Sequence, residues 1–242
     1  MMRHEVFRRL AIGAGAVAWT LAGPAGAVVV IDGFDTQQVL QIPAGGSGAA
    51  SASGVIAAPQ AIGGERDAIA SRDMGSGFVD LLVNPSGTDS SLSFALGASP
   101  GAATIVWDGP DGNAETLDSD GLGGIDLTQG GVNTGLQVRA RSDLATELVF
   151  TITGASGGVS DATLDLPAGT AYRQLFLPFS AFGTPELFAN AGSLSLQIAG
   201  EPGLDVQIAL VAAPEPSGAG VALAVLAALA FCHRRRTSLP LG

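Results

Sequence analysis

The chain contains no lysine, and its histidines and single cysteine lie only near its two ends, at His4, Cys232 and His233. The long middle, residues 28–213, therefore has neither an imidazole nor a thiol. These absences exclude from it a Ser-His-Asp triad, a cysteine nucleophile, a His or Cys zinc site and a disulfide. The missing lysine also excludes Schiff-base chemistry and a P-loop lysine. Carboxylates, hydroxyls and arginines remain, and we expect no catalytic residues and no enzyme.

Positive charge is scarce in the same middle. Residues 28–213 carry five arginines and twenty acidic residues, a formal charge of −15. Such a surface repels phosphate backbones, so we expect no nucleic-acid partner. It suits divalent cations and neutral sugars, although solubility outside the cell also explains it.

Helical periodicity is nearly absent from residues 28–213, and apolar residues recur there at every second position. The alternating stretches are 92–96, 136–140, 148–152, 194–198 and 204–210. Each has one buried and one wet face, and turns rich in glycine, proline and aspartate separate them. We therefore predict one all-β domain, a jelly-roll-like antiparallel β-sandwich, with Phe94, Phe150 and Leu210 among its inward residues.

A few features of this domain are less regular. Residues 44–58 are rich in glycine, alanine and serine, which is typical of a flexible loop or of a strand of small residues. Residues 185–191 come nearest to a helix. Trp107 and Tyr172 are the two aromatic residues whose polar edges are able to reach a ligand, but we expect a structural role for both, because core filling explains the aromatic rings of such a domain better.

The N-terminal residues 1–27 have the pattern of a secretory signal peptide. Arginines at positions 3, 8 and 9 precede an apolar run over 10–22, and Ala25-Gly26-Ala27 forms a cleavage site of small residues. Cleavage is expected before Val28. The general secretory route is our preferred interpretation, and a twin-arginine signal at Arg8-Arg9 is the alternative.

The C-terminal residues 214–242 have a second targeting pattern. Pro214-Glu215-Pro216 precedes an apolar segment over about 217–232, and Arg234, Arg235 and Arg236 follow it. The apolar segment predicts a short membrane helix. Arginines hold their end of such a helix in the cytoplasm, so everything before Pro214 is expected outside the inner membrane.

This tail resembles the PEP-CTERM sorting signal of Gram-negative bacteria, which an exosortase-type transpeptidase recognises. The resemblance implies export by the secretion machinery, transient membrane anchoring, and release to the cell surface or medium. A single-pass anchor that is never cut is the alternative. The middle is also similar to a recurrent ectodomain of PEP-CTERM proteins, in Asp32-Gly33-Phe34, Gly63 to Asp67, Trp107-Asp108-Gly109, Leu122 to Leu127 and Gly203 to Val206.

Acidic residues are concentrated between Asp108 and Asp126. Hard oxygen ligands at this density are what calcium selects, although the spacing fits neither an EF-hand nor a nonapeptide repeat. A solvated acidic turn with no bound cofactor is nevertheless the preferred interpretation, and a calcium site is the alternative. The candidate calcium ligands are Asp108, Asp111, Asn113, Glu115, Asp118 and Asp120.

Glu65-Arg66-Asp67 begins a predicted strand that ends at Arg72-Asp73. Alternation places Glu65 and Asp67 on one face and Arg66 on the other. A cross-strand ion pair with Arg139 or Arg141 is the preferred interpretation of the two carboxylates. A role in sugar binding is the alternative.

These observations favour a non-enzymatic exported surface or matrix protein, associated with extracellular polysaccharide or biofilm. A carbohydrate- or calcium-dependent binding module with the same delivery is the alternative. A glycosidase is a remote third possibility, because twenty carboxylates contain close pairs by chance and no other catalytic signature accompanies them.

Overall fold

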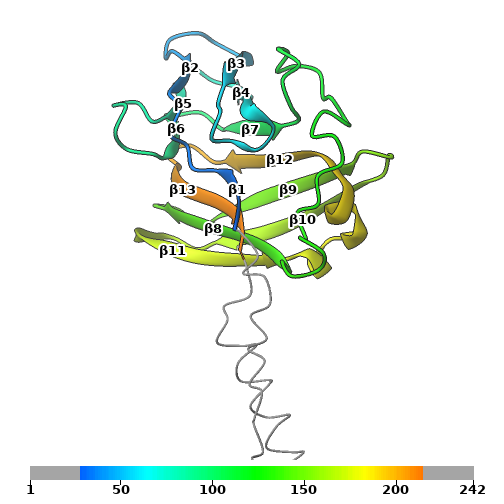
Figure 1. Cartoon of the computed structure of the whole chain (residues 1–242). Helices are drawn as coiled ribbons and strands as arrows, with labels where there is room; N and C mark the ends of the chain where they lie inside the picture. The colour runs from blue at the N-terminus through cyan, green and yellow to red at the C-terminus, as the bar shows by residue number, and fades with distance from the viewer. Residues whose placement is uncertain (1–27, 215–242) are drawn as a thin grey trace, which may run out of the picture.

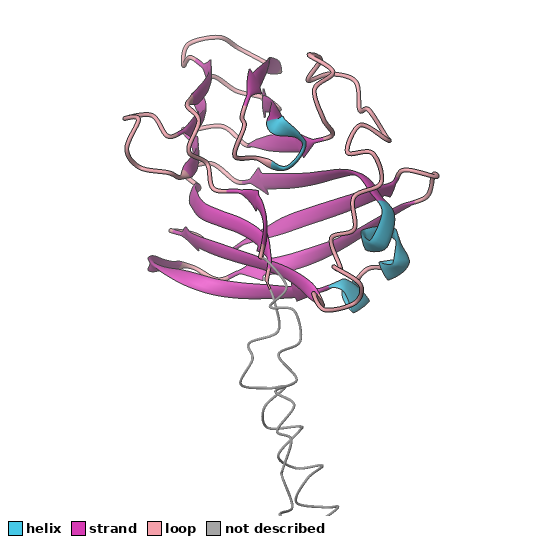
Figure 2. Ribbon diagram, viewed as in Figure 1, coloured by secondary structure: helices cyan, strands magenta, loops and turns pink. Residues whose placement is uncertain are grey.

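The computed structural model describes residues 28–214, which form a sandwich of two antiparallel β-sheets (Figures 1 and 2). The larger sheet has seven strands and the smaller sheet has six. The strands of the larger sheet are β1 (Val29–Asp32), β2 (Gln38–Ile42), β5 (Val79–Val83), β6 (Leu92–Leu96), β8 (Gly135–Ser142), β11 (Gly169–Pro178) and β13 (Asp205–Ala213). Those of the smaller sheet are β3 (Ala50–Ala57), β4 (Glu65–Arg72), β7 (Gly101–Trp107), β9 (Thr146–Gly154), β10 (Val159–Leu166) and β12 (Ala191–Gly200). Short 3₁₀ turns are η1 (Ile62–Gly64), η2 (Phe179–Ala181) and η3 (Pro185–Asn190).

The connections repeatedly cross from one sheet to the other. The order β11-β8-β13-β6-β5-β2 in the larger sheet matches β10-β9-β12-β7-β4-β3 in the smaller one, position by position, with strands that are neighbours in the sequence. Within each such pair, the chain forms one strand in one sheet and the next strand in the other sheet, which is a jelly-roll-like connectivity. The all-β antiparallel sandwich predicted from the alternation is therefore confirmed.

The core lies between the sheets and includes the residues that alternation assigned to it on β6, β8, β9 and β12. Phe94 and Phe150 are fully buried, as are Leu136, Leu148 and Leu194. Burying a large apolar side chain contributes about 1.5–3 kcal/mol, so this set is the main stabilising term of the domain.

Leu210 is the one inward prediction that is wrong. The register of β13 against β8 shifts between Ile208 and Leu210, so Leu210 pairs with Arg139. Val211 then pairs with Val138, and both are fully buried. A β-bulge adds one residue to a strand and moves the following side chains to the opposite face, which the alternation alone does not reveal.

The structure also decides between the alternatives for residues 44–58, since a strand of small residues, β3, occupies most of this range. The predicted helical segment is the 3₁₀ turn η3.

The two ends of the described domain lie side by side. Strand β1 pairs antiparallel with β13, and Val29 is the partner of Ala213 (Figure 1). The predicted signal peptide, the apolar segment 217–232 and the arginines 234–236 lie outside the described residues, and of the Pro-Glu-Pro motif only Pro214 is described. Within residues 28–214, no helix has the length and apolar character needed to cross a membrane.

Candidate functional site

Strand β4 directs neighbouring charged residues to opposite sides of the smaller sheet. Arg66 is fully buried and faces the core, where Asp32 is its ion-pair partner. Asp67 and Glu65 face the other way, toward the loop of residues 108–134 that joins β7 to β8. The alternation predicted from the sequence is therefore confirmed. It places Arg66, which has an ion-pair partner, and Asp67, which has none among the described residues, on opposite faces of the sheet.

The buried guanidinium of Arg66 has a hydrogen-bond partner for each of its nitrogens. It donates to Asp32 Oδ2 at 2.9 Å, to Gln38 Oε1 at 2.9 Å and to the carbonyl of Thr36 at 2.6 Å. Trp107 Nε1 also donates to Asp32 Oδ2, at 3.0 Å. The sequence motifs that contain Asp32, Arg66 and Trp107 thus meet in one buried hydrogen-bond network.

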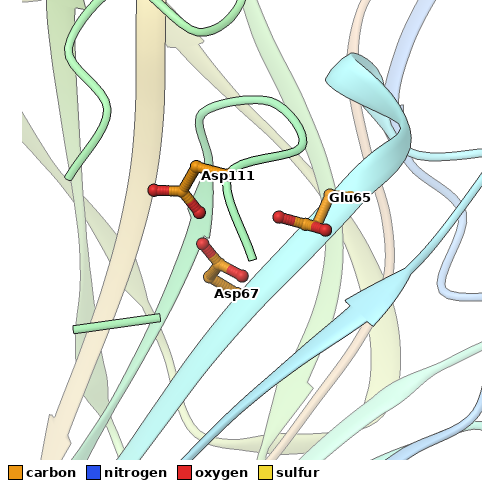
Figure 3. A group of neighbouring side chains, drawn as sticks. All are labelled: Glu65, Asp67 and Asp111. Atoms are coloured by element: carbon orange, nitrogen blue, oxygen red, sulfur yellow. The ribbon is translucent and has the colours of Figure 1, made fainter. Parts of the chain in front are cut away.

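On the opposite face of β4, three carboxylates gather (Figure 3). Glu65, Asp67 and Asp111 each place an oxygen within 4.8 Å of the others. Asp67 is only 1% exposed, and neither of its carboxylate oxygens has a hydrogen-bond partner. We call these three residues the acidic cluster.

The expected ion pair of Glu65 or Asp67 with Arg139 or Arg141 is wrong. Both arginines lie on β8, in the other sheet, and the one ion pair found among residues 28–214 joins Arg66 to Asp32. Alternation gives the face of a residue within its strand, whereas strand order decides which residues it meets.

The surroundings of the acidic cluster favour neutral carboxyl groups. Burial raises the pKa of Asp67 to about 7, and the charges of Asp108, Asp111 and Glu65, together with an interaction between the Asp67 and Asp108 side chains, act in the same direction. Burial also raises the pKa of Asp108, against the opposing hydrogen bond from the backbone N–H of Asp118. Asp108 is 2% exposed. Two adjacent buried aspartates thus lack a compensating positive charge.

The structure divides the candidate calcium ligands predicted from the sequence into two groups. Asp111 belongs to the acidic cluster, and Asp108 lines a cavity of about 160 Å³ beside it together with Asp67 and Glu115. The remaining acidic and amide groups form local turns: Asn113 Oδ1 accepts from the N–H of Glu115, and Asp118 Oδ1 accepts from that of Asp120. Sequence reasoning did not connect Glu65 and Asp67 to this loop, although their shared face was the signal for it.

A second cluster lies on the outer face of the larger sheet, formed by Arg139, Arg141, Tyr172 and Gln207, which we call the Tyr172 face. The guanidinium carbons of Arg139 and Arg141 lie 4.9 Å and 5.0 Å from the centre of the Tyr172 ring. Gln207 Oε1 accepts from the Tyr172 hydroxyl at 3.1 Å and from Arg141 Nη2 at 2.8 Å. These contacts hold four polar side chains from three neighbouring strands in one arrangement.

Two hollows adjoin the Tyr172 face and share Arg141 and Gln207 as lining residues. The one of about 420 Å³ is bordered by the turn between β5 and β6 as well as by Tyr172. The other, of about 170 Å³, reaches Asp143 and Asp205. Burial and the charge of Asp143 raise the pKa of Asp205, while Arg141 opposes them. The Tyr172 side chain therefore lies at a surface depression, and its hydroxyl donates to Gln207 within the protein.

No family model matches the chain, and no curated protein matches it by sequence. Similar solved structures include the family 11 carbohydrate-binding module from Clostridium thermocellum in complex with a β-1,3-1,4-mixed-linked tetrasaccharide, with 11% identity, a TM-score of 0.36, and coverage of 76% of this chain and 94% of that chain. The solution structure of CtCBM11 has 14% identity and a TM-score of 0.41, covering 80% and 98%. An agarase, AgWH50C, has 10% identity and a TM-score of 0.39, covering 57% and 22%. Likenesses at these scores and identities establish neither a family nor a ligand.

Proposed function

We propose that this chain is an exported, non-catalytic β-sandwich module that binds polysaccharide through the Tyr172 face. The observation that carries the proposal is the fixed arrangement of Tyr172, Arg141 and Gln207 beside a surface hollow of about 420 Å³. A rigid aromatic ring with oriented polar groups around it is the usual composition of a site for small polar ligands.

The hydrogen-bonding capacity left on this face suits a hydroxyl-rich ligand. Gln207 Oε1 is occupied by Arg141 and Tyr172, which turns the donor end of the amide away from them. In the part of the chain that the structure describes, the guanidinium of Arg139 contacts the Tyr172 ring and forms no hydrogen bond with protein. Unused donors beside an aromatic ring match the acceptors of a sugar chain.

Net charge favours a neutral polysaccharide over a polyanionic one. The domain has a formal charge of −15, and Asp89 lines the larger hollow. This net charge repels a polyuronate at long range, whereas Arg139 and Arg141 attract carboxylates at the face itself, so the polyuronate in the binding experiment decides between the two effects.

The proposal includes delivery by the C-terminal signal. The pairing of β1 with β13 brings Val29 and Ala213 together, so segments attached to the two ends leave the domain from one place. Segments on either end would therefore hold the same side of the domain toward a membrane. Export and exosortase processing of a PEP-CTERM tail belong to the proposal on the sequence patterns alone.

Affinity electrophoresis of the purified protein against neutral polysaccharides and one polyuronate tests the binding function. We expect at least one neutral polysaccharide to retard the protein. Tyr172→Ala and Arg139→Ala should each weaken this binding by about tenfold or more, the effect of removing a central aromatic or arginine anchor.

Arg173→Ala is the matched control. Arg173 follows Tyr172 on β11 and pairs with Ala140, whose side chain is on the inner face of the sheet, so Arg173 points away from the Tyr172 face. This substitution should leave the affinity unchanged, and circular dichroism should show that every variant is folded. Retardation by none of the polysaccharides, or equal retardation of Tyr172→Ala and the unsubstituted protein, would refute the proposed site.

A further inference from the structure

We propose that Glu65, Asp67 and Asp111, with Asp108 beside them, bind one calcium ion that fastens the loop of residues 108–134 to strand β4. This site lies on the smaller sheet and is separate from the Tyr172 face. It also differs from the ligand set predicted from the loop sequence, because two of its carboxylates come from β4.

Asp67 is the observation that points to a cation. Its side chain is almost completely buried, and both carboxylate oxygens face the acidic cluster without a hydrogen-bond partner (Figure 3). A buried carboxyl group without a partner is unfavourable in its neutral form and more so in its charged form, and proteins normally provide hydrogen bonds, an opposite charge or a metal ion. The arginine next to it, Arg66, points to the core and is bound to Asp32.

The geometry of the acidic cluster fits a calcium ion. Calcium binds oxygen ligands at 2.3–2.6 Å, so oxygens on opposite sides of the ion are about 5 Å apart. The three carboxylates place oxygens within 4.8 Å of one another. The adjoining cavity of about 160 Å³ leaves room for the water molecules that complete its coordination.

The ligand chemistry excludes most other metals. Residues 28–213 contain no histidine and no cysteine, so a site here consists of hard oxygen donors, which suit calcium and disfavour zinc or copper. The partly used carboxylates retain acceptor capacity. Glu65 Oε1 accepts one backbone N–H, from Gly112, and Asp111 Oδ1 accepts one from Asn113.

A cation at this position would connect two parts of the chain that are far apart in sequence. Glu65 and Asp67 are on β4, which pairs with β3 and β7 in the smaller sheet, whereas Asp111 is on the loop between β7 and β8. Binding to the folded state alone stabilises it in proportion to the logarithm of the calcium concentration.

Calorimetric titration and thermal unfolding of the purified protein test this site. We expect calcium chloride to bind with one ion per chain and to raise the Tm by roughly 5 °C over the protein in chelator. Magnesium at the same concentration should give a much smaller shift. Asp67→Asn and Asp111→Asn should each weaken calcium binding by about tenfold or more, since affinity follows the number of charged ligands.

Asp120→Asn is the matched control, because Asp120 is an exposed acidic residue of the same loop outside the acidic cluster. It should bind calcium like the unsubstituted protein. Asp111 is exposed, so its variant reports on the site even if Asp67→Asn fails to fold. Equal Tm values in calcium and in chelator, equal effects of magnesium and calcium, or a loss of binding in Asp120→Asn with none in Asp111→Asn would each overturn the proposal.

Discussion

At the scale of single residues, Arg66 and Asp67 show two outcomes for a buried charge. Arg66 has donors fixed by Asp32, Gln38 and a carbonyl, so the cost of its desolvation is offset by charge-assisted hydrogen bonds. Asp67 has no such partner. The first residue is therefore structural, and the second is the residue on which the proposed calcium site rests.

The Arg66 network gives a prediction about stability. Asp32→Ala leaves a buried guanidinium unpaired and also removes the acceptor of Trp107 Nε1, so we expect a loss of about 3–5 kcal/mol in the free energy of unfolding. Chemical denaturation measures this loss. Asp161→Ala, at an exposed position of β10, should change the stability by less than about 0.5 kcal/mol. Equal losses of unfolding free energy in Asp32→Ala and Asp161→Ala would show that the buried ion pair contributes no more to stability than an exposed residue does.

Asp67 gives a prediction about pH in the presence of a chelator. Its pKa is raised to about 7 in the folded protein, against about 3.9 in an unfolded chain. Between these values the folded state binds more protons, so this residue lowers the stability as the pH rises from about 4 to 7. We expect the Tm in chelator to fall from pH 5 to pH 8, and Asp67→Asn to reduce that fall. An unchanged pH profile in the variant would contradict the assignment of the shift to Asp67.

At the scale of elements, the positions of the strands could be predicted from the sequence, whereas the pairing of one strand with another could not. Alternation located β6, β8, β9 and β12, because each buries one face and wets the other. The alternation did not reveal the β-bulge that turns Leu210 outward. The bulge is a shift in the pairing of β13 with β8, and residues 204–210 continue to alternate in the sequence across it.

The candidate site shows the same limit for a loop. The acidic composition of residues 108–126 favoured a solvated turn and left a calcium site as the alternative, and Asp111 lies in the acidic cluster. The contribution of β4 depends on a contact between segments more than forty positions apart, Gly112 N–H to Glu65 for example. A local pattern cannot contain such a contact, since loop closure is decided by the packing of the whole sandwich.

Gly121 gives a prediction at this scale, because it brings the two arms of the loop together. A Cβ atom at Gly121 would lie 1.7 Å from the carbonyl oxygen of Asp108. Gly121→Ala should therefore displace Asp108, lower the stability by about 1–3 kcal/mol and weaken calcium binding. Gly183→Ala is the control, because its added Cβ would meet its nearest neighbour, Ser160 Oγ, at an ordinary 3.6 Å. Thermal unfolding and calorimetry of both variants would detect the difference, and equal behaviour would exclude the close contact as a constraint.

At the scale of the whole molecule, the two proposed sites lie on different sheets. The Tyr172 face belongs to the larger sheet, whereas the acidic cluster lies on β4 of the smaller sheet. Calcium at the acidic cluster would therefore act on stability without entering the proposed polysaccharide site.

The ends of the mature protein give the last prediction, which rests on the signal-peptide pattern and on the C-terminal sorting pattern. We expect the mature chain to begin at Val28 and to have lost Arg234 to Arg236, because the tail resembles a signal that an exosortase cuts. Mass spectrometry of protein recovered from the producing cell and its medium measures both ends. Replacing Glu215 by alanine should leave the arginines in place and keep the protein in the membrane fraction, whereas Ser217→Ala should be processed normally. A mature pool that retains Arg234 in the unsubstituted protein would show that the tail is an uncut anchor, while binding at the Tyr172 face would be judged by its own experiment.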